Sequence, residues 1–182
     1  MMQEIEKVLI SEEALQKRIQ ELGMELARDY EGKMPVFVGV LKGVILFFGD
    51  MIRATPIRSQ IDLMAVSSYG AGTESSGKIV LKKDVSLNLE GRHVIVLEDI
   101  IDTGLTLKFT VEHLRAMNPA SLKICTLLDK PERRNPNVTV QADYVGFTVP
   151  NEFVVGYGLD YNEGYRNLPY VGVLKPEVYE TK

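Results

Sequence analysis

The stretch "VIVLEDIIDTGLTL", residues 94–107, predicts a strand, a turn and a helix in direct succession. Apolar residues at four consecutive positions, Val94 to Leu97, are typical of a central parallel strand that is covered on both faces. This strand leads to two adjacent carboxylates, Glu98 and Asp99, and a third, Asp102, follows in the turn. A unit of this kind indicates an α/β fold, in which ligands bind at the carboxyl ends of the strands.

The turn after this strand has the residues expected of an anion site. Thr103, Gly104, Leu105 and Thr106 would lie at the N-terminus of the helix, where unpaired N–H groups and the helix dipole favour a phosphate. The threonine hydroxyls add donors, whereas Leu105 would contribute little beyond its backbone amide. The chain contains neither the G-x-x-x-x-G-K-[ST] phosphate loop nor a glycine-rich dinucleotide fingerprint.

The carboxylates beside this anion site have two interpretations. Glu98 and Asp99 precede the turn by about the length of a sugar, and carboxylates accept hydrogen bonds from vicinal ribose hydroxyls. The segment therefore predicts a site for a phosphorylated ribose. Alternatively, Glu98, Asp99 and Asp102 are acidic residues near a helix start that the helix dipole stabilises.

Helix and strand patterns alternate along the rest of the chain. Ser11 is expected to cap a helix whose apolar residues recur on one face as far as Gly32, and a second apolar helix is predicted at 44–53. The helix after the anion turn should end at Asn118 and Pro119. We predict one domain, residues 1–182, with a mostly parallel central sheet flanked by helices. Further strands are predicted at 34–41, 61–70, 78–85, 121–128, 142–149, 152–159 and 170–174, with 61–70 and 78–85 forming a hairpin.

The composition limits the classes of function. A net charge of −4 gives no general attraction to nucleic acid or anionic lipid. The single cysteine, Cys125, excludes an intrachain disulfide, suits a reducing compartment and should be buried and inert in its apolar strand. The N-terminus lacks the apolar core of a signal peptide, and no apolar run approaches membrane-spanning length. We therefore expect a soluble cytoplasmic protein with no nucleic-acid or membrane partner.

With these motifs in place, the sequence resembles type I phosphoribosyltransferases, and its "EDIIDTG" form is most similar to the hypoxanthine-guanine members. Four other motifs occur in the family's order, so the similarity covers nearly the whole chain: "LKG" at 41–43, "SSYG" at 67–70, "LLDK" at 127–130 and "FVVGYGLDYNEGYRNLPYVGVL" at 153–174. The resemblance implies a mobile hairpin loop, a small hood formed by the chain ends, and a homodimer or homotetramer. It also implies that the substrates are phosphoribosyl pyrophosphate (PRPP) and a purine base, and that the products are a nucleoside monophosphate and pyrophosphate.

The resemblance also implies a role for each residue of the sugar and phosphate site. The residues implied to bind the ribose phosphate are Glu98, Asp99, Asp102, Thr103, Gly104, Leu105 and Thr106. Those implied to bind pyrophosphate are Leu41, Lys42, Gly43 and Arg166. Mg²⁺ would be held by substrate oxygens together with Asp160, Glu98 and Asp99. A loop that closes over the site and excludes water would include Ser67, Ser68, Tyr69 and Gly70.

The implied purine site consists of Lys130, Phe153, Val154 and Asp160. Phe153 would stack on the base, an interaction that any purine face allows. Lys130 has only donors, so it suits a 6-oxopurine and would leave the amino group of adenine unpaired. The backbone near Val154 and Asp160 would bind the other edge of the base, and Asp102 would manage the proton at purine N7.

Several alternatives stay open. Phe153 is by default a core residue, Lys130 and Arg166 solvated charges, and Asp160 a turn residue. Asn151 stands where relatives often have an acidic residue, which leaves the acceptance of xanthine open.

Two other functions also remain. One is a phosphoribosyltransferase for adenine, uracil or orotate, which Lys130 disfavours. The other is a non-catalytic regulator that binds nucleic acid, which would be expected to lose Asp102 or Asp160 and to add a basic face. His93 and His113 have no spacing for metal binding or nucleophilic catalysis, and we assign them no role.

Overall fold

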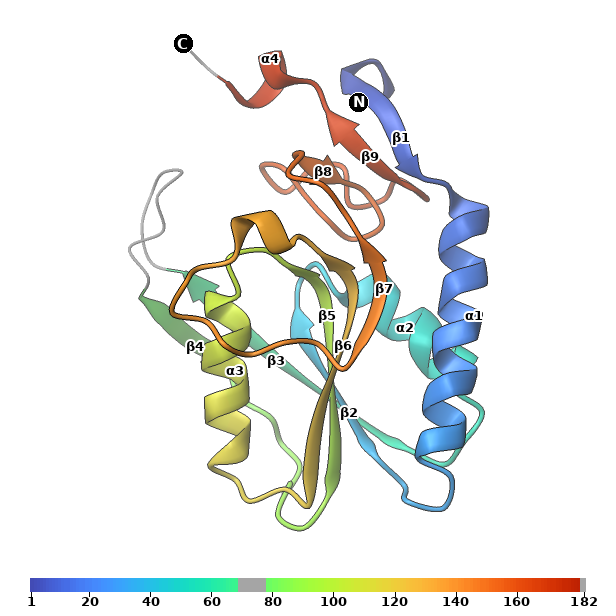
Figure 1. Ribbon diagram of the computed structural model, residues 1–182, viewed down its shortest axis with the longest axis vertical. Coiled ribbons are helices and arrows are strands. Elements are labelled where there is room, and N and C mark those ends of the chain that lie inside the picture. Colours follow the sequence, from blue (N-terminus) through green and yellow to red (C-terminus); the bar gives the residue numbers. More distant parts are fainter. Residues whose placement is uncertain (69–77, 181–182) are drawn as a thin grey trace.

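The computed structural model describes residues 1–68 and 78–180 and contains a main sheet, helices on both of its faces and a smaller sheet at one end (Figure 1). The six strands of the main sheet follow the order β4-β3-β2-β5-β6-β7. All neighbouring strands are parallel except β3 and β4, which are antiparallel. This arrangement confirms the predicted α/β fold with a mostly parallel sheet. The strands are β2 (Val36–Leu41), β3 (Gln60–Ser68), β4 (Ile79–Lys83), β5 (His93–Ile101), β6 (Ser121–Asp129) and β7 (Tyr144–Thr148).

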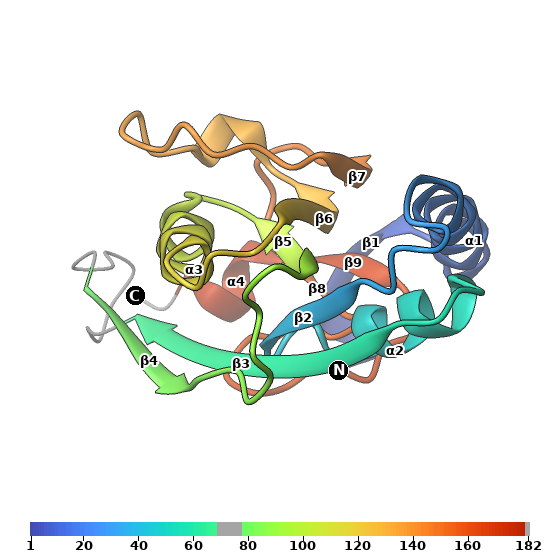
Figure 2. The same cartoon turned by 90° about the horizontal axis from the view of Figure 1, so that it is seen from below.

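Helices cover both faces of this sheet, as Figure 2 shows: α3 (Leu105–Arg115) on one face, α1 (Glu12–Asp29) and α2 (Ile45–Ala54) on the other. The side chains of β5 alternate between the two faces, because successive residues of a strand point in opposite directions. Ile95 and Leu97 belong to the core beneath α1 and α2, while Val94 and Val96 belong to the core beneath α3. Burial on both faces explains the continuous apolar run in the sequence.

The first helix forms as its sequence predicts. Ser11 caps α1, and its side chain accepts a hydrogen bond from the Ala14 amide at 3.1 Å. The predicted apolar positions are all buried against the sheet: Leu15, Ile19, Leu22 and Leu26.

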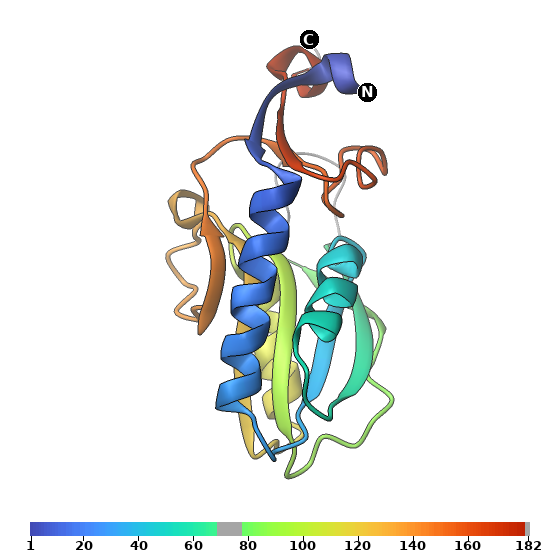
Figure 3. The same ribbon diagram turned by 90° about the vertical axis from the view of Figure 1, so that its right-hand side faces the viewer.

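The second sheet is the predicted hood, because strands near both chain ends form it. Its order is β1-β9-β8, with β1 (Ile5–Ile10), β8 (Val154–Val155) and β9 (Val171–Leu174) all antiparallel. Figure 3 shows both chain ends on this side of the molecule, where the short helices η1 (Met2–Glu4) and α4 (Pro176–Tyr179) also lie. A further short helix, η2 (Pro131–Arg133), follows β6.

The strand predicted at 152–159 was wrong in its extent, since only Val154–Val155 is extended. Three consecutive residues with positive φ, Gly156 (96°), Tyr157 (50°) and Gly158 (98°), turn the chain away from the sheet. Within the described residues, no helix is both long and apolar enough to cross a membrane.

The Ser11 cap generates a stability prediction. Ser11→Ala should lower the free energy of unfolding by about 1 kcal/mol, because the Ala14 amide loses its acceptor, while Ser11→Gly should cost only a few tenths of a kcal/mol. Urea denaturation of both variants measures this difference. Equal effects of Ala and Gly would contradict a capping role.

Candidate active site

The acidic pair lies within β5 rather than between the strand and the turn, which corrects the predicted boundary at Leu97. Backbone pairing with β6 continues to Ile101, and this pairing holds Glu98 opposite Thr126 in an extended conformation. Glu98 is buried, with 4% of its surface exposed, while Asp99 is half-buried.

Burial gives both carboxyl groups unusual proton affinities. It raises the pKa of Glu98 well above its ordinary value, and the neighbouring charge of Asp99 adds to the effect. Among the residues that the structure describes, Glu98 Oε1 has no hydrogen-bond partner. Burial also raises the pKa of Asp99 to about 6, against the opposing effects of the Ile100 amide, 2.7 Å from Asp99 Oδ1, and of Arg166. These carboxylates would gain from a nearby cation.

The predicted anion turn forms at the start of α3, which begins at Leu105. Gly104 adopts a left-handed conformation, with φ of 83°, and a Cβ there would lie only 2.8 Å from Val138 Cγ1. The Leu105 amide lies 3.4 Å from Thr103 Oγ1, a long hydrogen bond. A glycine is therefore required at position 104, where the chain enters α3.

The loop after β2 packs directly on Asp99. The peptide bond between Leu41 and Lys42 is cis. A Cβ on Gly43 would overlap Asp99 Oδ2, and a Cβ on Gly158 would overlap the Gly43 carbonyl oxygen. Glycines at both positions thus allow the 41–43 loop, the end of β5 and the loop after β8 to meet.

An ion-pair network joins these loops. Lys42 Nζ lies 2.9 Å from Glu163 Oε2, and Arg166 Nη2 lies 3.3 Å from both Glu163 Oε1 and Asp160 Oδ1. Arg166 also donates from Nη1 to the Gly158 carbonyl at 2.8 Å, and Asp160 Oδ2 accepts the Glu163 amide at 2.9 Å. The structure therefore brings together Lys42, Arg166 and Asp160, the residues that the family resemblance implied. It adds Glu163, which the sequence analysis did not single out.

A cavity of about 780 Å³ lies at the carboxyl ends of β2, β3 and β5. Of the predicted loop residues, Ser67 and Ser68 reach it, whereas Tyr69 and Gly70 lie outside the described residues. Leu105 is the one residue of the predicted anion turn that does not line it. The other predicted residues that line it are Leu41, Lys42, Gly43, Glu98, Asp99, Asp102, Thr103, Gly104, Thr106, Asp160 and Arg166.

A second cavity, of about 560 Å³, adjoins the first beneath the hood. Both are lined by Asp99, Ile100, Asp102 and Asp160, so Asp102 stands where they meet. All four residues of the predicted purine site line the second cavity: Lys130, Phe153, Val154 and Asp160.

Lys130 is not a solvated surface charge, and Phe153 is not a residue of the main core, which were the alternatives for these two side chains. Lys130 is buried, with 7% of its surface exposed, and its Nζ donates to the Glu152 carbonyl at 2.8 Å. Burial lowers the pKa of Lys130, against the opposing charge of Asp102. Phe153 is half-buried at the cavity wall rather than inside the main core.

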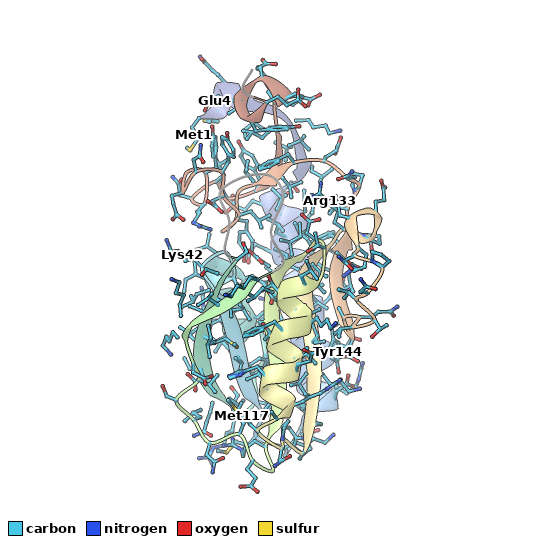
Figure 4. All side chains as sticks on the ribbon, turned by 90° about the vertical axis from the view of Figure 1, so that its left-hand side faces the viewer. Met1, Glu4, Lys42, Met117, Arg133 and Tyr144 are labelled. Atoms are coloured by element: carbon cyan, nitrogen blue, oxygen red, sulfur yellow. The ribbon has the colours of Figure 1, made fainter. Side chains whose placement is uncertain are left out.

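Sequence reasoning also missed two neighbours of the second cavity. Arg133 Nε lies 3.3 Å from Asp102 Oδ1, and Figure 4 labels Arg133 and Lys42 near the level at which the hood meets the main sheet. The ring of Tyr179 stacks on Phe153, with centroids 4.6 Å apart and planes 20° apart. No sequence period marks either residue, because each reaches the cavity from a short helix.

The cysteine and the histidines lie away from both cavities. Cys125 is buried in the core, and burial raises the pKa of its thiol to about 12. His93 Nδ1 lies 2.7 Å from Ser121 Oγ, and His113 Nε2 lies 2.9 Å from Asp84 Oδ1. These contacts give the histidines structural partners.

The fold and site define an α/β protein that binds a nucleotide-like ligand at the carboxyl edge of a parallel sheet. The family model described as "Phosphoribosyl transferase domain" matches residues 8–162. The hypoxanthine-guanine phosphoribosyltransferase of Bacillus subtilis is 53% identical over 181 residues, which cover 100% of this chain and 99% of that protein. A crystal structure of a hypoxanthine phosphoribosyltransferase from Staphylococcus aureus superposes with a TM-score of 0.94 at 49% identity, covering 99% of this chain and 97% of that one.

A longer relative also matches. The bifunctional protein TilS/HprT of Listeria monocytogenes is 56% identical over 176 residues, 97% of this chain, and the match spans only 27% of that protein's length. The chain belongs to the phosphoribosyltransferase family, in its hypoxanthine-guanine group.

The raised pKa of Asp99 generates a prediction about stability and pH. A carboxyl group whose pKa rises on folding, here from 3.8 to about 6, binds more protons in the folded state, so its contribution to stability falls as pH rises from about 4 to 6. Asp99→Asn should therefore increase the free energy of unfolding at pH 7.5 and lose this advantage as pH falls toward 4. Urea denaturation across this range measures it.

The control variant is Asp129→Asn, which makes the same change of side chain at a carboxylate that is paired with Arg134. It should lower the free energy of unfolding at pH 7.5, the opposite of the effect expected for Asp99→Asn. If Asp99→Asn changes the free energy of unfolding equally at pH 4 and pH 7.5, burial of the Asp99 charge does not destabilise the fold.

Proposed function

We propose that this protein transfers the phosphoribosyl group of PRPP to hypoxanthine or guanine, giving inosine or guanosine monophosphate and pyrophosphate, a purine salvage reaction. The observation that carries the proposal is the junction of the two cavities at Asp99, Asp102 and Asp160. A phosphorylated sugar in the first cavity would hold its anomeric carbon at this junction, beside a base in the second. The names of the B. subtilis and S. aureus relatives support the same reaction.

In this proposal the first cavity binds PRPP at three places. The anion turn from Thr103 to Thr106 binds the 5′-phosphate at the start of α3. Asp99 and Glu98 accept hydrogen bonds from the ribose hydroxyls. The pyrophosphate group lies by the 41–43 loop and Arg166, where a lysine and an arginine supply positive charge.

The carboxylates at the junction fit a divalent cation. Asp160 and Asp99 line both cavities, and Glu98 lines the first with a buried oxygen that has no partner among the described residues. Hard cations prefer such carboxylate oxygens. The described part of the chain has no cluster of three His, Cys, Asp or Glu side chains arranged to hold an ion. Asp160, Glu98 and Asp99 would therefore supply only some of the Mg²⁺ ligands, and substrate oxygens would supply the rest. When bound, Mg²⁺ supplies positive charge that stabilises the departing pyrophosphate.

Asp102 acts as the general base in this mechanism. As the bond between the anomeric carbon and pyrophosphate breaks, positive charge develops on the sugar ring, and a purine ring nitrogen forms the new bond to that carbon. The purine loses a proton from N7, which Asp102 accepts; in reverse, Asp102 returns it. The position of Asp102 between the cavities supports this role.

The second cavity selects the base. Lys130 Nζ is directed by its hydrogen bond to the Glu152 carbonyl and keeps further N–H groups for the 6-oxygen of the purine. Phe153 offers an aromatic surface for the base, and the backbone near Val154 and Asp160 binds the opposite edge. This donor set favours 6-oxopurines over adenine.

Other parts of the proposal rest on family membership. A homodimer or homotetramer and a cytoplasmic location are typical of such enzymes. The alternative of a non-catalytic, nucleic-acid-binding regulator is disfavoured, because both Asp102 and Asp160 are present at the junction and the chain is acidic overall.

The test is a spectrophotometric assay that offers hypoxanthine, guanine, xanthine and adenine separately with PRPP and Mg²⁺. Turnover of hypoxanthine or guanine, with little turnover of adenine, is the expected result. Turnover of adenine alone, or of none of the four, would refute the proposed function.

Replacing Asp102 should slow the chemical step. Asp102→Ala removes the proposed base, so single-turnover rates should fall on the order of 10²-fold or more while the dissociation constant for PRPP changes far less. Asp99→Ala is the contrast, because it should weaken PRPP binding. Loss of PRPP binding in Asp102→Ala at an unchanged chemical rate would show that Asp102 is not the base.

Replacing Lys130 should relax base selection. Lys130→Gln adds an acceptor that can meet the 6-amino group of adenine, so discrimination in kcat/KM between hypoxanthine and adenine should weaken by about 1–3 kcal/mol. Lys130→Met, which has no donor and only a weak sulfur acceptor, should slow hypoxanthine turnover with little gain in adenine turnover. An unchanged ratio of kcat/KM for hypoxanthine and adenine in Lys130→Gln would show that Lys130 does not select the base.

A further inference from the structure

We propose that Glu163 is an internal counter-anion that competes with pyrophosphate for Lys42 and Arg166 and so weakens the binding of this product. The inference rests on the proposed function, because it assumes that these two cations bind pyrophosphate. It adds a role for a carboxylate that lines the first cavity beside these two cations.

The geometry places one oxygen of Glu163 on each cation. Oε2 lies 2.9 Å from Lys42 Nζ, and Oε1 lies 3.3 Å from Arg166 Nη2. The carboxylate thus spans two cations contributed by different loops, as an oxyanion ligand would. These contacts hold the Glu163 pKa below its ordinary value, with the hydrogen bond from Lys42 the main cause.

The position of Arg166 does not depend on this contact. Arg166 Nη1 donates to the Gly158 carbonyl at 2.8 Å, and Nη2 lies 3.3 Å from Asp160 Oδ1. Two anchors on the loop after β8 therefore hold the guanidinium in place when Glu163 leaves it. If Glu163 only positioned Arg166, these anchors would make it redundant.

The Glu163 side chain is also free to leave. Its exposed fraction is 66%, and that of Lys42 is 68%. The Glu163 backbone is held separately, because its amide donates to Asp160 Oδ2 at 2.9 Å. Rotation of the side chain would release both cations without moving the loop.

Competition follows from this arrangement. A pyrophosphate that pairs with Lys42 and Arg166 must first displace the carboxylate, and the lost ion pairs subtract from its binding free energy. As pyrophosphate departs, Glu163 can re-form both ion pairs, which favours release. Exposed ion pairs are individually weak, so the effect on affinity should be moderate, about two- to five-fold.

The test is calorimetric titration of the full chain with pyrophosphate at fixed Mg²⁺ and ionic strength. Glu163→Gln keeps the size and backbone of the residue and removes its charge, so the dissociation constant should fall about two- to five-fold. The matched control is Glu21→Gln, which makes the same change of charge at a surface ion pair with Arg18 on α1 and should leave the constant unchanged.

A double-mutant cycle sharpens the result. In a Lys42→Met background, Glu163→Gln should tighten pyrophosphate binding less than in the wild type, because one of the two contested cations is gone. Weaker or unchanged binding in Glu163→Gln, or a gain equal to that of Glu21→Gln, would overturn the inference while leaving the proposed function intact. A wild-type protein that binds no pyrophosphate would overturn the proposed function, and this inference with it.

Discussion

The close packing of Gly43 against Asp99 and Gly158 determines how the main sheet and the hood meet. No side chain larger than hydrogen fits at either glycine, so the loop after β2 packs against the Asp99 carboxylate of β5 and against the backbone of the loop after β8. Because these three segments meet, one side chain from each, Lys42, Asp99 and Arg166, lines the same cavity. The second cavity depends on the same approach, because Asp160 follows Gly158 by two residues and lines both cavities.

A second constraint is the burial of negative charge at this junction. Glu98 and Asp99 lie where β5 pairs with β6, and burial makes their ionised forms costly. A protein that needed only stability would place apolar residues there. Two carboxylates at this end of a central strand make sense if a bound cation or sugar hydroxyls offset the free-energy cost of burying their charge. Functional sites commonly contain such destabilising buried charges.

Much of the fold could be predicted because its signals are local. Continuous apolar residues marked β5, and the Ser11 cap and its apolar stripe marked α1. The strand expected at 152–159 failed because positive φ at Tyr157 cannot be read from an apolar run. The sequence could predict that Glu98, Asp99, Asp102 and most of the 103–106 turn lie at one site, because they are nearly consecutive. Glu163, Arg133 and Tyr179 reach the cavities through contacts that depend on how distant loops pack.

The hood also sets an order of assembly. Its longest strand pairing joins residues 5–10 to residues 171–174, while neighbouring strands of the main sheet pair over much shorter separations. Long-range pairings bear the largest loop-closure entropy and form late in folding. The turn between β5 and α3 can therefore be complete before the Phe153 and Tyr179 rings come together, so the first cavity should form ahead of the second.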